Sequence, residues 1–351
     1  MRRLLAPLTI ALFVAALAAP AAAAPAAPRV RARTGVLMDA ATGAVLWQRD
    51  AHKPMLIAST TKILTALVAE QTYPADKVFV VSRAGENVDG TRLGYQQGMR
   101  VKRHDLLATM LMVSANDAAE TLAAAYPRGG RAGFLAAMQA EAKSLGCTDS
   151  TFRDPSGLDA PDHQASAADL AVLGRALLRR PELAKIVSSR TAKYRWPDGH
   201  VQVITNHNHL ISLGRDPGAL GIKTGYTVAA HSTIVAAERR DGRILIAVAL
   251  RTDDMYTDVR SMFAYGFATK AAPNAAVLGV VSVPTTTPAG APPRAARASV
   301  LGTERRAARP PDSGPILARV AAAPVPALAT AAIALLVIGV TVTAFSRSQH
   351  R

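Results

Sequence analysis

Hydrophobic residues follow a helical period through the middle of the chain. Residues 63–69 form a run that is apolar except for Thr65, which predicts a buried helix that opens near Ser59. The same period continues in further segments, at residues 106–111, 117–125, 134–142 and 170–178. Ser166 and Asp169 resemble a capping box ahead of the last segment. The chain from about residue 75 to residue 190 is therefore predicted to be mostly α-helical.

Short β-prone runs flank this helical middle. Residues 34–39 and 44–48 lie on either side of a glycine-containing turn and predict a hairpin. Later strands and a closing helix are predicted at residues 219–226, 232–237, 243–250 and 255–267. Strands are predicted near both ends of this region, on either side of the helical middle. The predicted fold class is therefore α/β in the broad sense, and more narrowly α+β. It is an antiparallel sheet flanked by helices, with an inserted mainly α subdomain.

The two ends of the chain have the character of targeting segments. Residues 1–27 combine a charged start, an apolar stretch and alanine-rich sequence, which is typical of a secretory signal peptide. Residues 273–324, rich in Pro, Ala and Arg, predict an extended linker. Residues 325–345 carry no charge and would span about 31 Å as a helix, which predicts a transmembrane helix with a cytoplasmic tail at 346–351. The domain at 28–272 would then lie on the extracytoplasmic face of a bacterial membrane.

Charge and cysteine content narrow the function classes. The formal net charge is +16, but much of it lies in the predicted signal, linker and tail, and aromatic residues make up only 5% of the chain. We therefore expect no nucleic-acid partner, and anionic envelope polymers or lipids suit the charge better. A single cysteine, Cys147, excludes an internal disulfide and any cysteine-ligated metal. His207 and His209 have no third ligand at usable spacing, so no metal site is predicted.

Ser59 and Lys62 form the first of three polar motifs. Residues three apart on a helix share a face, so the hydroxyl and the amine can meet. A lysine kept neutral by burial or by a second cation can take the proton of a serine and make it a nucleophile. The first helical turn also offers N–H groups to an oxyanion. A serine that merely caps a helix has the same spacing, so this motif is weak alone.

Two further motifs supply polar groups later in the chain. Ser114 and Asn116 lie at a predicted helix junction, where a hydroxyl and an amide can pass a proton and orient a substrate. A capped turn would give the same pair. Lys223, Thr224 and Gly225 end a predicted strand and offer a cation, a hydroxyl and close backbone approach to a carboxylate-bearing substrate. A chance Lys-Thr-Gly has a probability of roughly 0.06 in a chain of this length, so this triplet is more informative.

In this order, the three motifs resemble those of penicillin-binding proteins and class A β-lactamases. The resemblance covers about residues 33–268 and implies a β-lactamase/transpeptidase-like fold. It is strongest to the serine-type D-alanyl-D-alanine carboxypeptidases, the low-molecular-mass penicillin-binding proteins of the peptidase S11 type. The similar stretches are Met55–Lys62, Leu111–Ala119, Thr151–Leu158 and Ile222–Thr227. Ala115 departs from the glycine common in the family, and a linker replaces the β-sheet domain that follows in many members.

The resemblance implies a role for each residue in acylation. Ser59 would attack the carbonyl of the penultimate D-alanine of a peptidoglycan pentapeptide, with Lys62 as general base. Ser114 would relay the proton towards the leaving amine, and Asn116 would hold the substrate amide. Water would then release the acyl-enzyme, and β-lactams would act as covalent inhibitors.

The resemblance also implies how the substrate is held. Lys223, Thr224 and Gly225 would receive the terminal carboxylate, and the backbone N–H groups of Ser59 and Tyr226 would form the oxyanion hole. No metal or organic cofactor is required. Functions for Arg251, as a carboxylate contact, and for Asn206 and Asn208, as cleft-lining polar groups, stay open.

Other functions on the same fold remain to be weighed. A D,D-transpeptidase shares the acyl-enzyme and differs only in whether an amine or water resolves it. A serine β-lactamase of class A uses a glutamate for deacylation, and residues 153–159 contain none. A non-catalytic module that binds wall peptides is a further alternative. All the catalytic side chains are present, and such a module would not need them.

Overall fold

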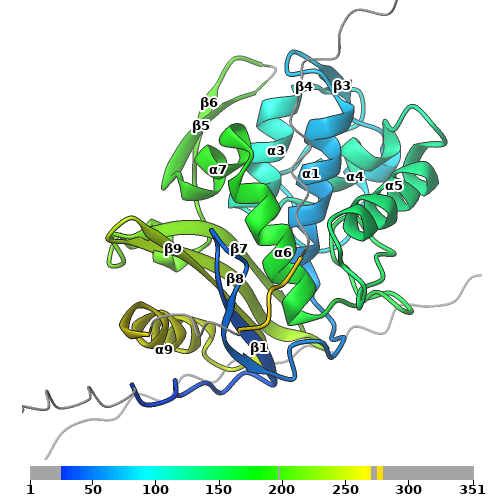
Figure 1. The fold of residues 1–351 in the computed structure, drawn as a ribbon. Helices are drawn as coiled ribbons and strands as arrows, with labels where there is room; N and C mark the ends of the chain where they lie inside the picture. The colour runs from blue at the N-terminus through cyan, green and yellow to red at the C-terminus, as the bar shows by residue number, and fades with distance from the viewer. Residues whose placement is uncertain (1–24, 197, 270–274, 280–351) are drawn as a thin grey trace, which may run out of the picture. The chain divides into compact units, whose positions relative to one another are not determined.

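An antiparallel sheet in the strand order β2-β1-β9-β8-β7 organises one half of the described chain (Figure 1). The structure, a computed structural model, describes residues 25–196, 198–269 and 275–279. The strands of this sheet are Thr34–Asp39 (β1), Val45–Arg49 (β2), Ala219–Thr227 (β7), His231–Arg240 (β8) and Arg243–Thr252 (β9). Each neighbouring pair is antiparallel. The first hairpin and the last strands therefore share one sheet, and the predicted fold class is confirmed.

The helical half is inserted between β2 and β7. It opens with a 3₁₀ turn, η1 (Ala58–Thr61), which runs directly into α1 (Lys62–Thr72). The later helices are α2 (Arg83–Glu86), α3 (Arg103–Met112), α4 (Asn116–Ala124), α5 (Gly130–Ser144), α6 (Ala167–Leu178), α7 (Pro181–Ser188) and α8 (His209–Ser212). The closing helix α9 (Met255–Ala268) covers the outer face of the sheet, while α6 lies on the face towards the helical half (Figure 1).

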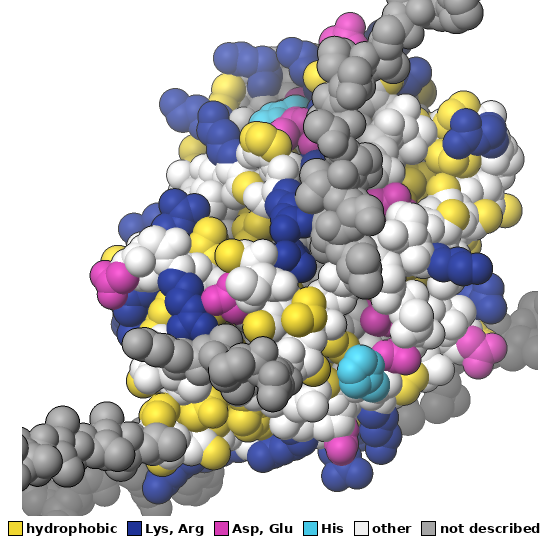
Figure 2. All heavy atoms as spheres, viewed as in Figure 1, with side chains coloured by type: hydrophobic (Ala, Val, Ile, Leu, Met, Phe, Trp, Pro, Cys, Tyr) yellow, Lys and Arg dark blue, Asp and Glu magenta, His cyan; other side chains and the backbone are white. Residues whose placement is uncertain are grey.

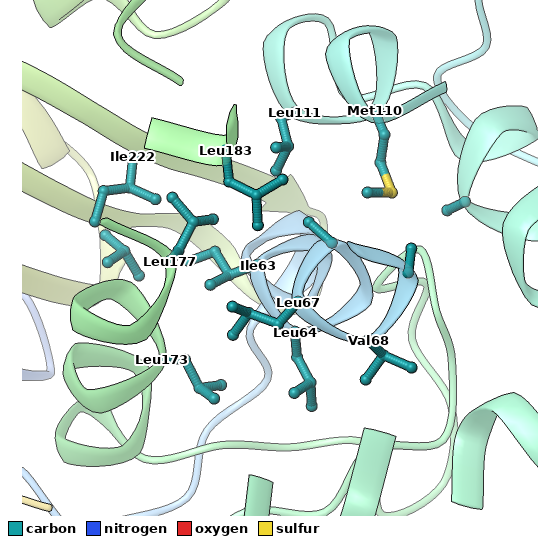
Figure 3. Packing of buried hydrophobic residues seen from close by; sticks show 14 of the residues in the cluster. Ile63, Leu64, Leu67, Val68, Met110, Leu111, Leu173, Leu177, Leu183 and Ile222 are labelled. Carbon is teal, nitrogen blue, oxygen red and sulfur yellow. The ribbon is translucent and has the colours of Figure 1, made fainter. Parts of the chain in front are cut away.

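Helix α1 lies in the centre of the core. Its apolar residues face several neighbours at once: Ile63, Leu64 and Leu67 lie among side chains from α3, α6 and α7 (Figure 3). A helix that is apolar all round is one that is covered on all sides. Ile63, Leu64 and Leu67 are fully buried, and so is Lys62 before them. The apolar run thus determines the position of the helix that begins at Lys62, directly after the turn that carries Ser59.

Two small hairpins were not predicted from the sequence. One pairs β3 (Val78–Val80) with β4 (Arg100–Lys102), and the other pairs β5 (Thr191–Arg195) with β6 (Val201–Thr205). Aromatic packing stabilises the second hairpin, because the ring of Tyr194 lies edge-on to the rings of both Tyr95 and Trp196. Such long-range packing leaves no local periodicity. The cap predicted at Ser166 is present, since its side chain accepts from Asp169 N at 3.0 Å.

The predicted end segments fall largely outside the described residues. Of the predicted linker at 273–324, residues 275–279 are described, and they return to the hairpin of β1 and β2. Val45 N donates to Ala276 O at 2.8 Å, and Leu278 N donates to Gly43 O at 2.9 Å. The segments 325–345 and 346–351, and most of 1–27, are not described. Within the described ranges, no helix has the length and apolar character needed to cross a bilayer.

Basic side chains are distributed over the surface. Figure 2 shows Lys and Arg side chains scattered over the face that it presents, with apolar and uncharged surface between them. On this face the basic side chains therefore contribute to a general field, which acts through solubility and weak attraction to anionic polymers.

Candidate active site

Ser59 and Lys62 meet at the junction of η1 and α1. Lys62 Nζ lies 2.9 Å from Ser59 Oγ and 2.7 Å from Asn116 Oδ1, and it also donates to the carbonyl of Ser156. The serine stands in a 3₁₀ turn instead of the expected α-helix, and side chains three apart eclipse in that geometry. Ala58, just before the nucleophile, has φ 47, an uncommon left-handed conformation. The turn therefore aims the hydroxyl at the amine.

The environment of Lys62 favours the neutral amine. Burial lowers the pKa of Lys62 well below its ordinary value, and the nearby charge of Lys223 lowers it further. The carboxylates of Asp154, Asp117 and Glu120 oppose this shift without cancelling it. A neutral lysine amine beside a hydroxyl can accept its proton.

Lys223 is buried on β7, and its pKa is also lowered. Burial lowers the pKa of Lys223 from 10.5 to about 7, and its Nζ donates to Thr224 O at 2.7 Å. The ammonium and the neutral amine are therefore both accessible near neutral pH. An anion bound here would favour the ammonium.

Gly225 allows β7 to approach the nucleophile turn. A Cβ atom on this residue would lie 2.8 Å from Ser59 N and 3.1 Å from Ala58 Cβ. The sequence analysis explained this glycine by the close approach of a substrate backbone. In the structure, the absence of a side chain at Gly225 also lets the backbone of η1 pack against β7. Tyr226, the next residue, has its side chain 68% exposed.

Ser114 and Asn116 stand at the predicted junction, between α3 and α4. Ser114 has φ 65, a strained conformation for a residue with a side chain, and strain of this kind clusters at functional sites. The Asn116 amide is held at both ends, since Oδ1 accepts from Lys62 and Nδ2 donates to Asp89 O at 2.7 Å. Asn116 therefore positions the amine of Lys62.

A turn at Asp154 completes the site. The sequence indicates a turn here, but not its contact with the catalytic lysine. Asp154 Oδ1 accepts from the backbone N–H groups of Ser156 at 2.9 Å, Gly157 at 2.7 Å and Leu158 at 3.0 Å. Gly157 has φ 88, and a Cβ there would lie 2.0 Å from Ala58 O. The turn aims the Ser156 carbonyl at Lys62 Nζ.

Asp154→Ala is expected to lower the free energy of unfolding by about 3 kcal/mol, because several N–H groups and Arg131 lose a charged acceptor. Hydrogen bonds lower the pKa of Asp154 although burial raises it. Its contribution to stability should therefore be present above the unfolded pKa and be lost as the pH falls through the folded one. Urea unfolding at pH 7 and pH 3 measures both effects. Equal stability of Asp154→Ala and wild type at pH 7 would contradict the assignment, and Asp149→Ala, at a carboxylate outside this turn, is the control.

The remaining polar candidates have structural contacts. Asn206 Nδ2 donates to the carbonyls of Val187 and Ser189, both at 3.1 Å. Asn208 caps α8 by accepting from Leu210 N. Arg251 donates to Ala229 O at 2.9 Å. The two buried asparagines thus hold the chain between α7 and α8. The Asn206 amide is engaged with the protein, whereas Asn208 Nδ2 is buried without a hydrogen-bond partner among the described residues.

Comparison with known proteins identifies the family. Residues 21–254 match the sequence profile of peptidase S11, D-alanyl-D-alanine carboxypeptidase. The chain belongs to this family. It is 39% identical over 220 residues to the D-alanyl-D-alanine carboxypeptidase DacB2 of Mycobacterium tuberculosis, which covers 61% of this chain and 73% of the relative. It is 33% identical over 262 residues to DacC of Escherichia coli, covering 69% of this chain and 62% of that relative.

Solved structures of family relatives share the fold. The D-alanyl-D-alanine carboxypeptidase of M. tuberculosis H37Rv matches with a TM-score of 0.68 at 34% identity, covering 74% of this chain and 98% of that one. The Streptomyces K15 DD-transpeptidase matches with a TM-score of 0.65 at 25% identity, covering 70% and 100%. The predicted family and its penicillin-binding fold are confirmed, and so is the prediction that this peptidase S11 member is a hydrolase of the D-alanyl-D-alanine carboxypeptidase type.

Proposed function

We propose that the chain removes the terminal D-alanine of peptidoglycan pentapeptide stems through an acyl-enzyme on Ser59. The observation that carries this proposal is the buried amine of Lys62, 2.9 Å from the Ser59 hydroxyl and depressed in pKa. A serine beside a neutral amine in a family of D-alanyl-D-alanine carboxypeptidases is equipped for acyl transfer.

Acylation begins with proton transfer from Ser59 Oγ to Lys62 Nζ. The oxygen attacks the carbonyl carbon of the penultimate D-alanine, and the backbone N–H groups of Ser59 and Tyr226 receive the developing oxyanion. The proton passes by way of Ser114 to the departing amine as the C–N bond breaks. Water then attacks the ester, with Lys62 again as base, and regenerates the hydroxyl.

Lys223 and Thr224 hold the carboxylate of the terminal residue. The ammonium form of Lys223 pairs with the carboxylate, and the Thr224 hydroxyl donates to it. Binding of the carboxylate raises the pKa of Lys223 again, so the bound substrate stabilises the ammonium form that binds it. Peptide stems and β-lactams enter the same site, since both present a carboxylate next to a reactive amide.

Transpeptidation is the second candidate, favoured by the likeness to the Streptomyces K15 DD-transpeptidase. The acyl-enzyme is common to both reactions, and an amine acceptor replaces water. A β-lactamase function has less support, because Asp154 in the loop of residues 153–159 is engaged by backbone N–H groups and Arg131.

The proposed enzyme acts outside the cytoplasm. The signal-like residues 1–27 and the uncharged residues 325–345 support export and a C-terminal anchor in the membrane. Cell-wall peptides are then the substrate within reach. The part of the predicted linker that follows residue 279 would give the catalytic domain room to move over the wall.

Incubation of the full chain with a fluorescent penicillin, and separately with diacetyl-L-lysyl-D-alanyl-D-alanine, tests the function. Wild type should take up the label and release D-alanine. Ser59→Ala should do neither, while Ser188→Ala, at a serine on α7 outside the site, should behave as wild type. Label without release of D-alanine would favour the transpeptidase, and the absence of both from folded wild type would overturn the proposal.

A further inference from the structure

His163 is a buried histidine that the proposed reaction does not use. The residue is 1% exposed and lies in the loop that leads from the Asp154 turn to α6. Two backbone hydrogen bonds fix the chain on either side of its Cα atom. His163 N donates to Ala160 O at 3.0 Å, and Gln164 N donates to Thr151 O at 3.0 Å. The imidazole ring therefore projects from a rigid part of the loop.

Both ring nitrogens of His163 have a hydrogen-bond partner. Nδ1 lies 2.9 Å from Arg153 N, and Nε2 lies 2.9 Å from Thr61 Oγ1. The backbone N–H of Arg153 can only donate, so Nδ1 is the acceptor and Nε2 carries the proton of the neutral ring. The Nε2–H group then donates to Thr61 Oγ1, and the hydroxyl of Thr61 donates to Ala58 O at 3.0 Å. The geometry thus selects one neutral tautomer.

The electrostatic surroundings also favour a neutral ring. Burial lowers the pKa of His163, while the carboxylates of Asp154 and Asp159 oppose that shift. The ring of Phe152 lies edge-on to the imidazole, with 6.2 Å between the ring centroids, and adds no charge. Protonation of Nδ1 would turn an N–H group towards the N–H group of Arg153. The imidazole therefore keeps the direction of both hydrogen bonds at neutral pH.

This series of hydrogen bonds ends at the residue before the nucleophile. Ala58 has φ 47, and a Cβ atom on Gly157 would lie 2.0 Å from its carbonyl oxygen. Thr61 donates to the same oxygen and directly precedes Lys62 in the chain. The imidazole thus connects the loop of residues 151–165 to both ends of the η1 turn.

We propose that His163 is a positioning residue for acyl transfer, which holds η1 against the loop of residues 151–165 and so aligns the Ser59 hydroxyl with the Lys62 amine. The inference rests on the proposed function and adds a residue to it. The ring donates to neither the nucleophile nor the base, so its effect on the reaction passes through Thr61. Loss of this connection should slow the chemical step and leave substrate binding unchanged.

Two substitutions in the full chain separate the two hydrogen bonds of His163. His163→Asn keeps an acceptor near the position of Nδ1 and has no group at that of Nε2, whereas His163→Gln places an amide near the position of Nε2. His163→Asn should lower the rate of labelling with a fluorescent penicillin about 10- to 100-fold, since a displacement of about 1 Å can cost about 10²-fold. His163→Gln should label within about threefold of wild type, because it keeps the donor to Thr61.

The steady-state constants for diacetyl-L-lysyl-D-alanyl-D-alanine distinguish positioning from binding. His163→Asn should lower kcat about 10- to 100-fold and change KM by less than about twofold, because the connection is to the reacting groups. The proposed carboxylate contacts, Lys223 and Thr224, lie on β7, outside this connection.

Thr61→Val tests the same connection from its other end. It removes the hydroxyl and should slow labelling as His163→Asn does. The double variant should be no slower than Thr61→Val, because the two residues act through one hydrogen bond. Tyr73→Phe is the control, since it removes a buried hydrogen bond to Leu122 O at the far end of α1. It should lower stability and label as wild type does, per mole of folded protein.

Three outcomes would overturn the positioning role: a folded His163→Asn protein that labels at the wild-type rate, losses that multiply in the double variant, or an equal loss in Tyr73→Phe. If His163→Asn does not fold, the labelling rate of Thr61→Val decides in the same way. Wild type that labels with penicillin and releases no D-alanine would instead overturn the proposed hydrolysis, and the labelling rates would still test the role of His163.

Discussion

Replacing Lys62 with methionine should slow acylation of Ser59 by about 10²- to 10⁴-fold, the contribution of a positioned general base. The amine lies 2.9 Å from Ser59 Oγ and is kept neutral by burial and by Lys223. No other amine or imidazole among the described residues lies within hydrogen-bond distance of this hydroxyl. Without Lys62, the serine keeps its proton and remains a weak nucleophile.

The rate of labelling with a fluorescent penicillin, per mole of folded protein, measures this loss. Methionine preserves the aliphatic volume, but it leaves the Asn116 and Ser156 oxygens without their donor, so near-ultraviolet circular dichroism must establish folding for each sample. Lys185→Met, at an exposed lysine of α7, is the matched control and should label as wild type does. A folded Lys62→Met protein that labels at the wild-type rate would exclude the lysine as base.

The sequence predicted those parts of the site whose position follows from a local pattern. The apolar run at 63–69 predicts a helix that is buried on all sides. Ser59 and Lys62 therefore lie at the N-terminal end of a central helix. The strand pattern around Lys223 likewise predicts an extended segment, and β7 is one. In both cases the period of the hydrophobic residues determines where the polar groups lie.

Other parts of the site depend on contacts that carry no local pattern. The Ser156 carbonyl that accepts from Lys62 is a backbone group, and any residue type supplies one. Its direction depends on Asp154 and on the close approach of Gly157 to Ala58, which are fixed only after α1 and the turn have packed. The hairpin of β5 and β6 is similar, because its place beside the site rests on Tyr194 and Trp196. The catalytic side chains could therefore be predicted from the sequence, whereas the backbone turn and the hairpin that hold them in place could not.

Lys223 should control both limbs of the pH profile of kcat/KM for a carboxylate-bearing peptide. Its pKa of about 7 means that the free enzyme loses the ammonium as the pH rises through neutrality, which weakens capture of the substrate carboxylate and lowers kcat/KM. On the acid side, kcat/KM should rise with pH as Lys62 loses its proton. The folded protein also binds fewer protons than the unfolded chain between pH 7 and 10.5, so this shift should make it more stable as the pH rises through that window.

Two substitutions separate these effects. Lys223→Arg keeps its charge throughout, so the alkaline limb should move to higher pH. Lys223→Met removes a charge-assisted pair and should lower kcat/KM about 10²-fold. It also removes a like charge from beside Lys62, which raises the pKa of that amine and moves the acid limb to higher pH. Profiles of kcat/KM against pH, measured by D-alanine release between pH 5 and 10, test the expected shift of each limb. Lys185→Arg and Lys185→Met are the controls. If the alkaline limb of Lys223→Arg coincides with that of wild type, Lys223 is not the group that titrates there, and the carboxylate is held by other means.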